Sequence, residues 1–184
     1  MAKRTFNSFK TKLSIKAPQI TLKELHVGKN KKKMRNAIAR GIEQGAQNAQ
    51  VTLRAALNKS MSKVVWGPFN PKYDYISAGG NLRTAGTLRS LIDTGALKDT
   101  LMFKSKVQPT RATVQIIYTS PYAKITHYGG LIRPYGNQFA RPVVLPARPW
   151  VSATLRGGYP GVDQYNWRWP FRKAIKTSWN QTFK

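Results

Sequence analysis

The chain has 184 residues, and its 32 Lys and Arg against 6 Asp and Glu give a formal net charge of +26 and a pI near 10.9. This excess destabilises an isolated monomer by self-repulsion and favours a polyanion or an acidic protein surface as a partner. The absence of cysteine excludes disulfides, thiolate nucleophiles and Cys-based zinc sites, and two histidines, His26 and His127, are too few for a His-rich metal site, so we expect no metal and no cofactor.

We expect two parts, a basic N-terminal arm over residues 1–29 and a single α+β domain over residues 30–184. Hydrophobic residues make up 41% of the chain, close to the ordinary globular share, so most of it should fold. The first residues lack the apolar stretch of a signal peptide, and no apolar run approaches the roughly twenty residues of a membrane span. The sequence therefore predicts a cytosol-like compartment and no membrane contact.

The arm carries a strand pattern. Leu13, Ile15 and Ala17 alternate with polar residues, which is typical of a strand, and residues 20–27 fit a second short one. A disordered basic tail is the alternative.

From residue 31 to about residue 58 the period becomes helical. Apolar and small residues recur every three or four positions and predict one stripe of a long amphipathic helix: Met34, Ile38, Ile42, Ala46, Ala49, Leu53 and Leu57. Gly41 and Gly45 lie on or beside this stripe and would allow another element to approach closely. The run Lys31, Lys32, Lys33 and Arg35 is a candidate contact for DNA or an acidic partner.

Residues 66–89 predict a long loop, because Pro and Gly are dense there. Trp66 and Tyr73 are unfavourable to leave in water, so the loop should pack on the domain itself or on a neighbour.

The single motif with the clearest match to a catalytic sequence is Asp93-Thr94-Gly95, which matches the catalytic loop of retropepsin-like aspartic proteases. That chemistry needs two carboxylates sharing a proton, and a homodimer could supply them. We favour a structural interpretation, in which Asp93 or Thr94 caps a short helix running to about Thr100. A protease remains a remote alternative, and we expect that this protein is not an enzyme.

Residues 101–118 give the clearest hairpin, since apolar and polar residues alternate on both sides of the turn at 108–111. A short helix over 122–128 should follow, with Pro121 opening it and Gly129-Gly130 ending it. His127 on this helix lacks a nucleophile partner and is expected to be structural. Residues 143–145 are the best strand in the Pro-punctuated stretch that follows.

The C-terminal segment combines Trp167, Trp169 and Trp179 with basic residues, and its spacing is helical from Phe171 onward, with Pro170 in a first turn. Exposed aromatics between cations are typical of stacking on nucleic-acid bases. The periodicity favours instead a docking helix whose aromatics are buried at a subunit contact.

Three segments in fixed order carry a resemblance: SLIDTGAL at 90–97, YAKITHYGG at 122–130 and LPARPW at 145–150. With the helix before them and the hairpin between the first two, the set over about residues 31–182 resembles the tail-completion or neck proteins of tailed phages, also called virion morphogenesis proteins. The basic arm, the aromatic loop and the insert at 157–161 depart from that pattern.

The resemblance implies a long N-terminal helix and a C-terminal helix packed on a small antiparallel sheet. It also implies a non-enzymatic subunit that forms a ring, commonly a hexamer, at the head–tail junction. Portal or head-completion adaptor proteins, tail-tube or tail-terminator proteins and the packaged DNA would be its partners, in the virion or in the host cytoplasm during assembly.

Candidate assembly residues are Trp66, Tyr73, Arg148, Trp150, Trp167, Trp169 and Trp179. Structural motif residues are Asp93, Thr94, Gly95, His127, Gly129, Gly130, Pro146 and Pro149. The alternative function is non-specific nucleic-acid binding.

Overall fold

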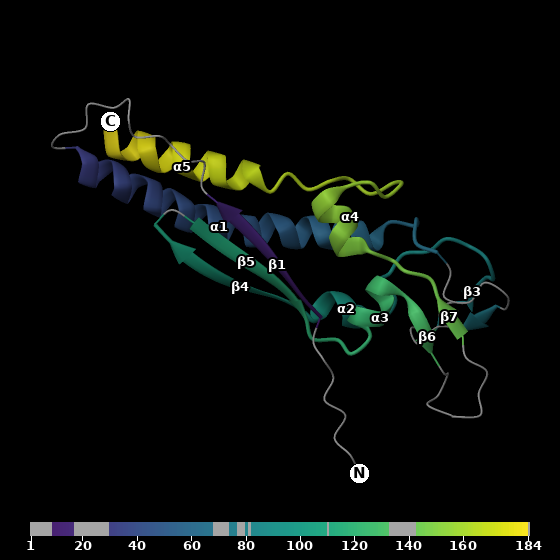
Figure 1. The fold of residues 1–184 in the computed structure, drawn as a ribbon. Coiled ribbons are helices and arrows are strands. Elements are labelled where there is room, and N and C mark those ends of the chain that lie inside the picture. The colour runs from purple at the N-terminus through teal and green to yellow at the C-terminus, as the bar shows by residue number, and fades with distance from the viewer. Residues whose placement is uncertain are drawn as a thin grey trace, which may run out of the picture. The chain divides into compact units, whose positions relative to one another are not determined.

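The computed structural model describes residues 9–16, 30–67, 74–76, 80, 82–109, 111–132 and 143–183. Its fold is α+β, as predicted, with a long N-terminal helix, a C-terminal helix and small sheets (Figure 1). The chain divides into two compact units. Unit 1 comprises Met1–Phe9, Ala56–Met102 and Ile117–Tyr165, and unit 2 comprises Lys10–Ala55, Phe103–Ile116 and Asn166–Lys184.

The helices and strands follow one another in mixed order. The helices are α1 (Lys31–Ser62), α2 (Ala96–Asp99), α3 (Ala123–Tyr128), α4 (Trp150–Arg156) and α5 (Arg168–Phe183). The strands are β1 (Phe9–Lys16), β2 (Tyr75–Ile76), β3 (Leu82–Arg83), β4 (Leu101–Gln108), β5 (Arg111–Tyr118), β6 (Gly130–Ile132) and β7 (Val143–Leu145). One sheet has the order β1-β5-β4, and β2-β3 and β6-β7 form two-stranded antiparallel ribbons. The short helix α4 was not predicted.

Helix α1 confirms the predicted amphipathic helix and continues one turn beyond the predicted end. Its apolar stripe is buried: Met34, Ala37, Ile42, Ala46, Ala49, Leu53, Leu57 and Met61. Residues 31–55 of α1 belong to unit 2 and its last turns belong to unit 1. Burial of one face every third or fourth residue is what stabilises so long a helix, because helix propensity alone contributes little.

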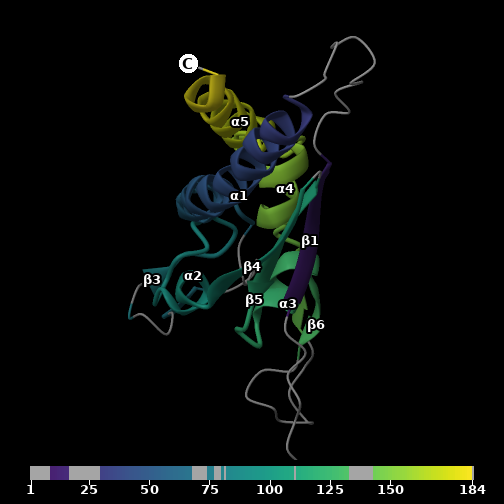
Figure 2. The same cartoon turned by 90° about the vertical axis from the view of Figure 1, so that its left-hand side faces the viewer.

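In unit 2, α5 lies beside α1, as Figures 1 and 2 show from two directions. The two glycines of α1 permit this approach. A Cβ atom on Gly41 would lie 2.6 Å from Ile175 Cα, and one on Gly45 would lie 3.0 Å from Phe171 Cα. The Ser178 hydroxyl donates to the Ala37 carbonyl at 2.8 Å and closes the contact with a buried hydrogen bond.

The hairpin β4–β5 confirms the prediction for residues 101–118, and β5 adds to the core of unit 2. A single cluster joins Ile42, Ala46 and Ala49 of α1, Ala112 and Val114 of β5, and Phe171 of α5. Strand β1 is the third strand of this sheet, so the strand predicted in the arm is confirmed and the disordered tail is wrong for residues 9–16. The second strand predicted at 20–27 lies outside the described residues.

In unit 1, the two ends of the predicted loop 66–89 pair with each other. The Trp66 backbone pairs with that of Arg89 as an isolated bridge, and the Leu91 amide donates to the Met61 carbonyl at 2.7 Å. The Trp66 indole donates to the Ser60 carbonyl at 2.9 Å. Packing of the loop on the domain itself is therefore confirmed at Trp66, while Tyr73 lies outside the described residues.

Replacing Gly41 by Ala tests the close contact of α1 with α5. The new Cβ would meet backbone atoms of Ile175, which cannot rotate away, so we expect Gly41→Ala to lower the free energy of unfolding by about 1–3 kcal/mol. Urea denaturation followed by circular dichroism measures it. The control is Gln47→Ala on the exposed face of α1, expected to change stability by less than about 0.5 kcal/mol. A Gly41→Ala protein more stable than the parent, as helix propensity alone would make it, would contradict the contact.

Candidate functional site

Unit 1 brings the three motif segments together in space. A hollow of about 350 Å³ is lined by residues 89–98, which include the whole first segment, by Tyr122 and Thr126 of the second and by Arg148 of the third. Ser120 and Ile76 complete its wall. We call the residues that hold this junction together, namely Thr126, His127, Gly129, Arg148 and Trp150, the motif node.

Arg148 lies at the centre of the motif node and has no exposed surface. Its side-chain Nε donates to the Gly67 carbonyl at 2.9 Å, and its backbone amide donates to the Thr126 carbonyl at 3.1 Å. The guanidinium thus hydrogen-bonds to a carbonyl of unit 1. Arg148 was a candidate assembly residue, and that role stays a prediction; on the single chain its side chain is buried.

Trp150 and Trp66, two other candidate assembly residues, are also fully buried on the single chain. The Trp150 ring packs edge-on against Tyr118, with ring centroids 5.5 Å apart, and Trp66 packs on Tyr159 at 4.6 Å. Large aromatic rings stabilise a fold most where they lose all contact with water, and both rings are buried in the core of unit 1.

The Gly129-Gly130 reversal is confirmed as the end of α3. Gly129 adopts φ 72° and ψ −175°, a region that is nearly restricted to glycine, and a Cβ atom there would lie 2.7 Å from both Ala147 N and Leu145 O. The second and third motif segments therefore touch through backbone alone at this point. Pro149 precedes α4 as its N-cap residue, and Pro146 lies beside Gly67.

The Asp93-Thr94-Gly95 turn corrects one detail of the prediction. The N-cap of α2 is Gly95, with φ 85°, and not Asp93 or Thr94. The Thr94 hydroxyl does accept a hydrogen bond from the Ala96 amide at 3.3 Å. A left-handed N-terminal residue strongly favours glycine, which explains the third position of the motif without any chemistry. The protease hypothesis stays an untested alternative.

His127 is buried within the motif node. Its Nε2 lies 3.2 Å from the Ser152 hydroxyl, and its ring packs edge-on against Trp150 and Tyr128, with centroids 4.9 and 4.7 Å away. Burial lowers the pKa of His127 from 6.5 to about 4, since the apolar surroundings disfavour the charged ring. The imidazole is therefore neutral at physiological pH and serves as a packed, hydrogen-bonded residue.

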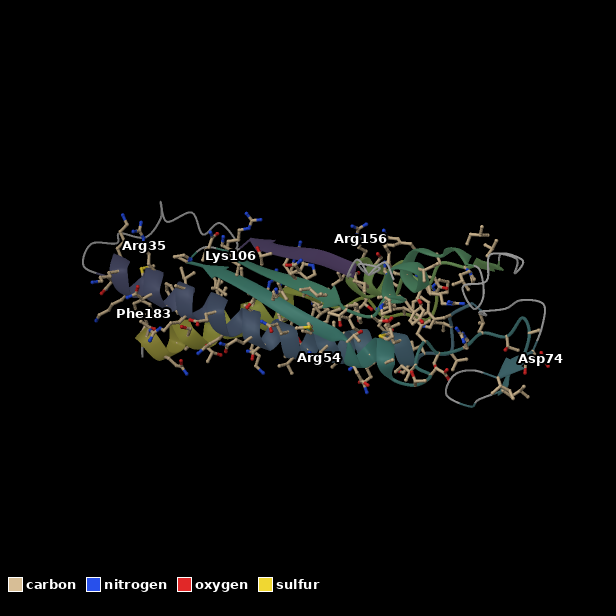
Figure 3. The ribbon with its side chains drawn as sticks, turned by 90° about the horizontal axis from the view of Figure 1, so that it is seen from below. Arg35, Arg54, Asp74, Lys106, Arg156 and Phe183 are labelled. Atoms are coloured by element: carbon tan, nitrogen blue, oxygen red, sulfur yellow. The ribbon has the colours of Figure 1, made fainter. Side chains whose placement is uncertain are left out.

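The predicted basic candidates lie at the exposed start of α1. Lys31, Lys32, Lys33 and Arg35 are all exposed, and Figure 3 shows Arg35 and Phe183 at the same end of unit 2. A helix start is the unfavourable place for cations, because the helix dipole is positive there, so these charges do not stabilise α1. They are available to an external anion.

Two exposed apolar surfaces were missed by the sequence reasoning. On each two-stranded ribbon of unit 1, a directly paired couple of aliphatic side chains faces solvent: Ile76 with Leu82, 73% and 69% exposed, and Leu131 with Val144, 62% and 67% exposed. We call them the two aliphatic pairs. A strand of two or three residues is too short to show a clear alternation of apolar and polar residues, so the sequence pattern did not predict these ribbons.

Comparisons with protein-family models, with curated proteins and with solved structures each found no match. Within the described ranges, no group of three or more His, Cys, Asp or Glu residues is placed to hold a metal ion. No helix in that part of the chain is long and apolar enough to cross a membrane.

Substituting Gly129 tests whether backbone contact holds the motif node together. Gly129→Ala adds strain at positive φ and a clash with the backbone at residues 145–147, so we expect a loss of at least about 3 kcal/mol in the free energy of unfolding. Gly158→Ala is the matched control, because Gly158 has φ 81° but nothing within 4 Å of its Cβ position, so strain alone should cost about 1 kcal/mol. Equal losses in the two variants, measured by thermal or urea unfolding, would rule out the contact.

Acidification tests the burial of His127. The unfolded chain binds a proton on this ring below pH 6.5 and the folded chain only near pH 4, so the free energy of unfolding should fall by up to about 3 kcal/mol between these values. In His127→Gln that pH dependence should disappear, and in the control His26→Gln it should persist. Urea unfolding at several pH values measures the slope, and a slope unchanged in His127→Gln would contradict the assignment.

Proposed function

We propose that this protein is a structural virion subunit of a tailed phage, which forms a ring at the head–tail neck, completes the tail and joins it to the head. The observation that carries the proposal is the meeting of the three motif segments in unit 1. Segments 90–97, 122–130 and 145–150, which carry the resemblance to tail-completion proteins, line one hollow, and the second and third also touch through their backbones.

The chemistry of the motif node favours a scaffold over a reactive centre. Its most basic group, Arg148, is bonded to a backbone carbonyl, and its histidine is neutral and packed between rings. Its glycine is needed for a close backbone approach. Each of these residue types serves to shape a subunit, and the shape of a subunit determines how it fits others.

The two aliphatic pairs supply surfaces for self-association. Each lies on a two-stranded ribbon, a structure that is marginally stable alone and presents unpaired strand edges. Exposed aliphatic side chains on such edges are typical of surfaces that a neighbour covers. Because copies of a chain with charge +26 repel one another, contacts between copies are best made through apolar patches such as these.

The positive charge fits the other proposed partners. Acidic surfaces of portal, adaptor, tail-tube or terminator proteins, and the DNA that passes through the channel, would each neutralise part of it. Among the candidate aromatic residues, Trp167 and Trp179 are half-buried and Trp169 is exposed, so all three present ring surface for contacts outside the subunit.

Assembly is the direct test of the proposal. The purified full chain, measured by multi-angle light scattering and imaged in negative stain over a range of concentrations, should form closed rings, with sixfold symmetry expected. A strictly monomeric or dimeric particle at every concentration would contradict it.

A paired substitution locates the interface between copies. Leu131→Glu with Val144→Glu places two charges on one aliphatic pair and should shift the light-scattering mass toward the monomer. Val51→Glu with Val64→Glu changes two similarly exposed aliphatic residues elsewhere and should leave the ring intact. Rings that survive the first change and are lost on the second would place the interface away from β6 and β7.

A further inference from the structure

The solvent face of α5 is a continuous basic stripe. Five exposed residues at positions i, i+1, i+4, i+5 and i+8 form it: Arg168, Trp169, Arg172, Lys173 and Lys176. Residues at this spacing share one side of a helix, and the cations Arg168, Arg172 and Lys176 follow one another at about 6 Å along its axis. The opposite side of α5, with Phe171, Ala174 and Ser178, is buried against the rest of unit 2.

The stripe also holds an exposed aromatic ring. Trp169 is 53% exposed, and the Lys173 ammonium lies 5.1 Å from its ring centroid. Burial of this ring at a subunit contact, expected from the sequence, stays a prediction, because Trp169 is exposed on the single chain. An indole left in water beside a cation is costly for a subunit alone, but it suits a ligand that combines planar apolar rings with negative charge.

Nothing in the described part of the chain neutralises the stripe. Arg168, Arg172, Lys173 and Lys176 form no ion pair with a described residue. Helix α5 has no acidic residue in its first turn and no basic one in its last, so its cations oppose the helix dipole. Most Lys and Arg of the chain fall in unit 2, with only Glu24 and Glu43 among its acidic residues. These charges therefore do not serve the stability of the subunit.

We propose that the basic stripe of α5 binds the phosphate backbone of nucleic acid, with Trp169 stacking on a base wherever the strand is single. A second copy of this chain is a poor occupant, because it would bring like charge to the stripe. An acidic protein surface would match the charge but not the combination of regularly spaced cations and an open indole face. Cations at a constant spacing on one straight element fit a polymer of evenly spaced phosphates.

The proposed function names DNA among the partners of the positive charge; this inference assigns nucleic acid to the α5 stripe in particular and does not depend on ring formation. Binding is measured on the chain in solution, whether or not it forms rings, so the failure of one proposal leaves the other standing.

Charge removal with a matched control tests the stripe. The variant Arg172→Gln, Lys173→Gln, Lys176→Gln loses one Arg and two Lys from α5. The control Arg156→Gln, Lys98→Gln, Lys124→Gln loses the same residue types from exposed positions in unit 1. Glutamine has nearly the helix propensity of Lys and Arg, so both proteins should fold, which circular dichroism and thermal melting verify.

Fluorescence anisotropy with a labelled DNA duplex, at several salt concentrations, gives the affinity and its salt dependence. Each phosphate contact contributes about 0.9 to the slope of log affinity against log salt, so the stripe variant should lose between two and three in slope. At physiological ionic strength this corresponds to a loss of affinity on the order of 100-fold, and the control should lose less than about tenfold. Equal losses in the two variants would overturn the proposal.

A competitor and a single substitution separate nucleic acid from other polyanions. Poly-glutamate should displace the duplex far less well than unlabelled DNA of equal charge, and equal displacement would overturn the assignment to nucleic acid. With a single-stranded oligonucleotide, Trp169→Leu should weaken binding about tenfold and Trp169→Phe should restore most of it, because a ring and not apolar bulk is needed for stacking. No difference between Leu and Phe would overturn the role of Trp169.

Discussion

Burial of one apolar stripe on α1 is the interaction on which both units depend. Ile42, Ala46 and Ala49 of this stripe form the core cluster of unit 2 with β5 and α5, and Leu57 and Met61 continue the buried stripe in the last turns of α1, which belong to unit 1. Apolar surface removed from water contributes about 25 cal/mol per Å², and a helix of 32 residues offers a long face for it. Gly41 and Gly45 weaken the helix locally, yet they allow α5 to approach its backbone, so the loss of propensity is offset by packing.

The motif node and the turn near it contain residue types common in catalytic sites, and here these residues have structural roles. Near the node, the glycine of the Asp93-Thr94-Gly95 turn caps α2, and within it Arg148 is buried with its Nε hydrogen-bonded to the Gly67 carbonyl. The histidine fills a space between Trp150 and Tyr128 and is kept neutral by burial. In each case the residue type is explained by a conformation, a hydrogen bond or a packing contact inside the subunit.

The charged and the apolar surfaces of the molecule are proposed to bind different partners. Copies of a chain with charge +26 repel one another, and the two aliphatic pairs on the ribbons of unit 1 are proposed as the apolar contacts between them. The basic stripe of α5 is proposed instead to bind an anionic polymer, because a second copy of the chain would bring like charge to it. A ring subunit that lines a channel for DNA would need both kinds of surface.

The sequence by itself determined the elements whose signals are local: the long helix from Lys31, the hairpin at 101–118, the Pro170 helix and the glycine end of α3, since periodicity and turn residues act over a few positions. It also determined the charge. Only the tertiary structure decided which side chains face water. Arg148, Trp66 and Trp150 were candidate docking residues and are buried, whereas Trp169, another such candidate, is exposed. Burial depends on segments that are far apart in the chain, such as Gly67 against Arg148, and no local pattern contains that information.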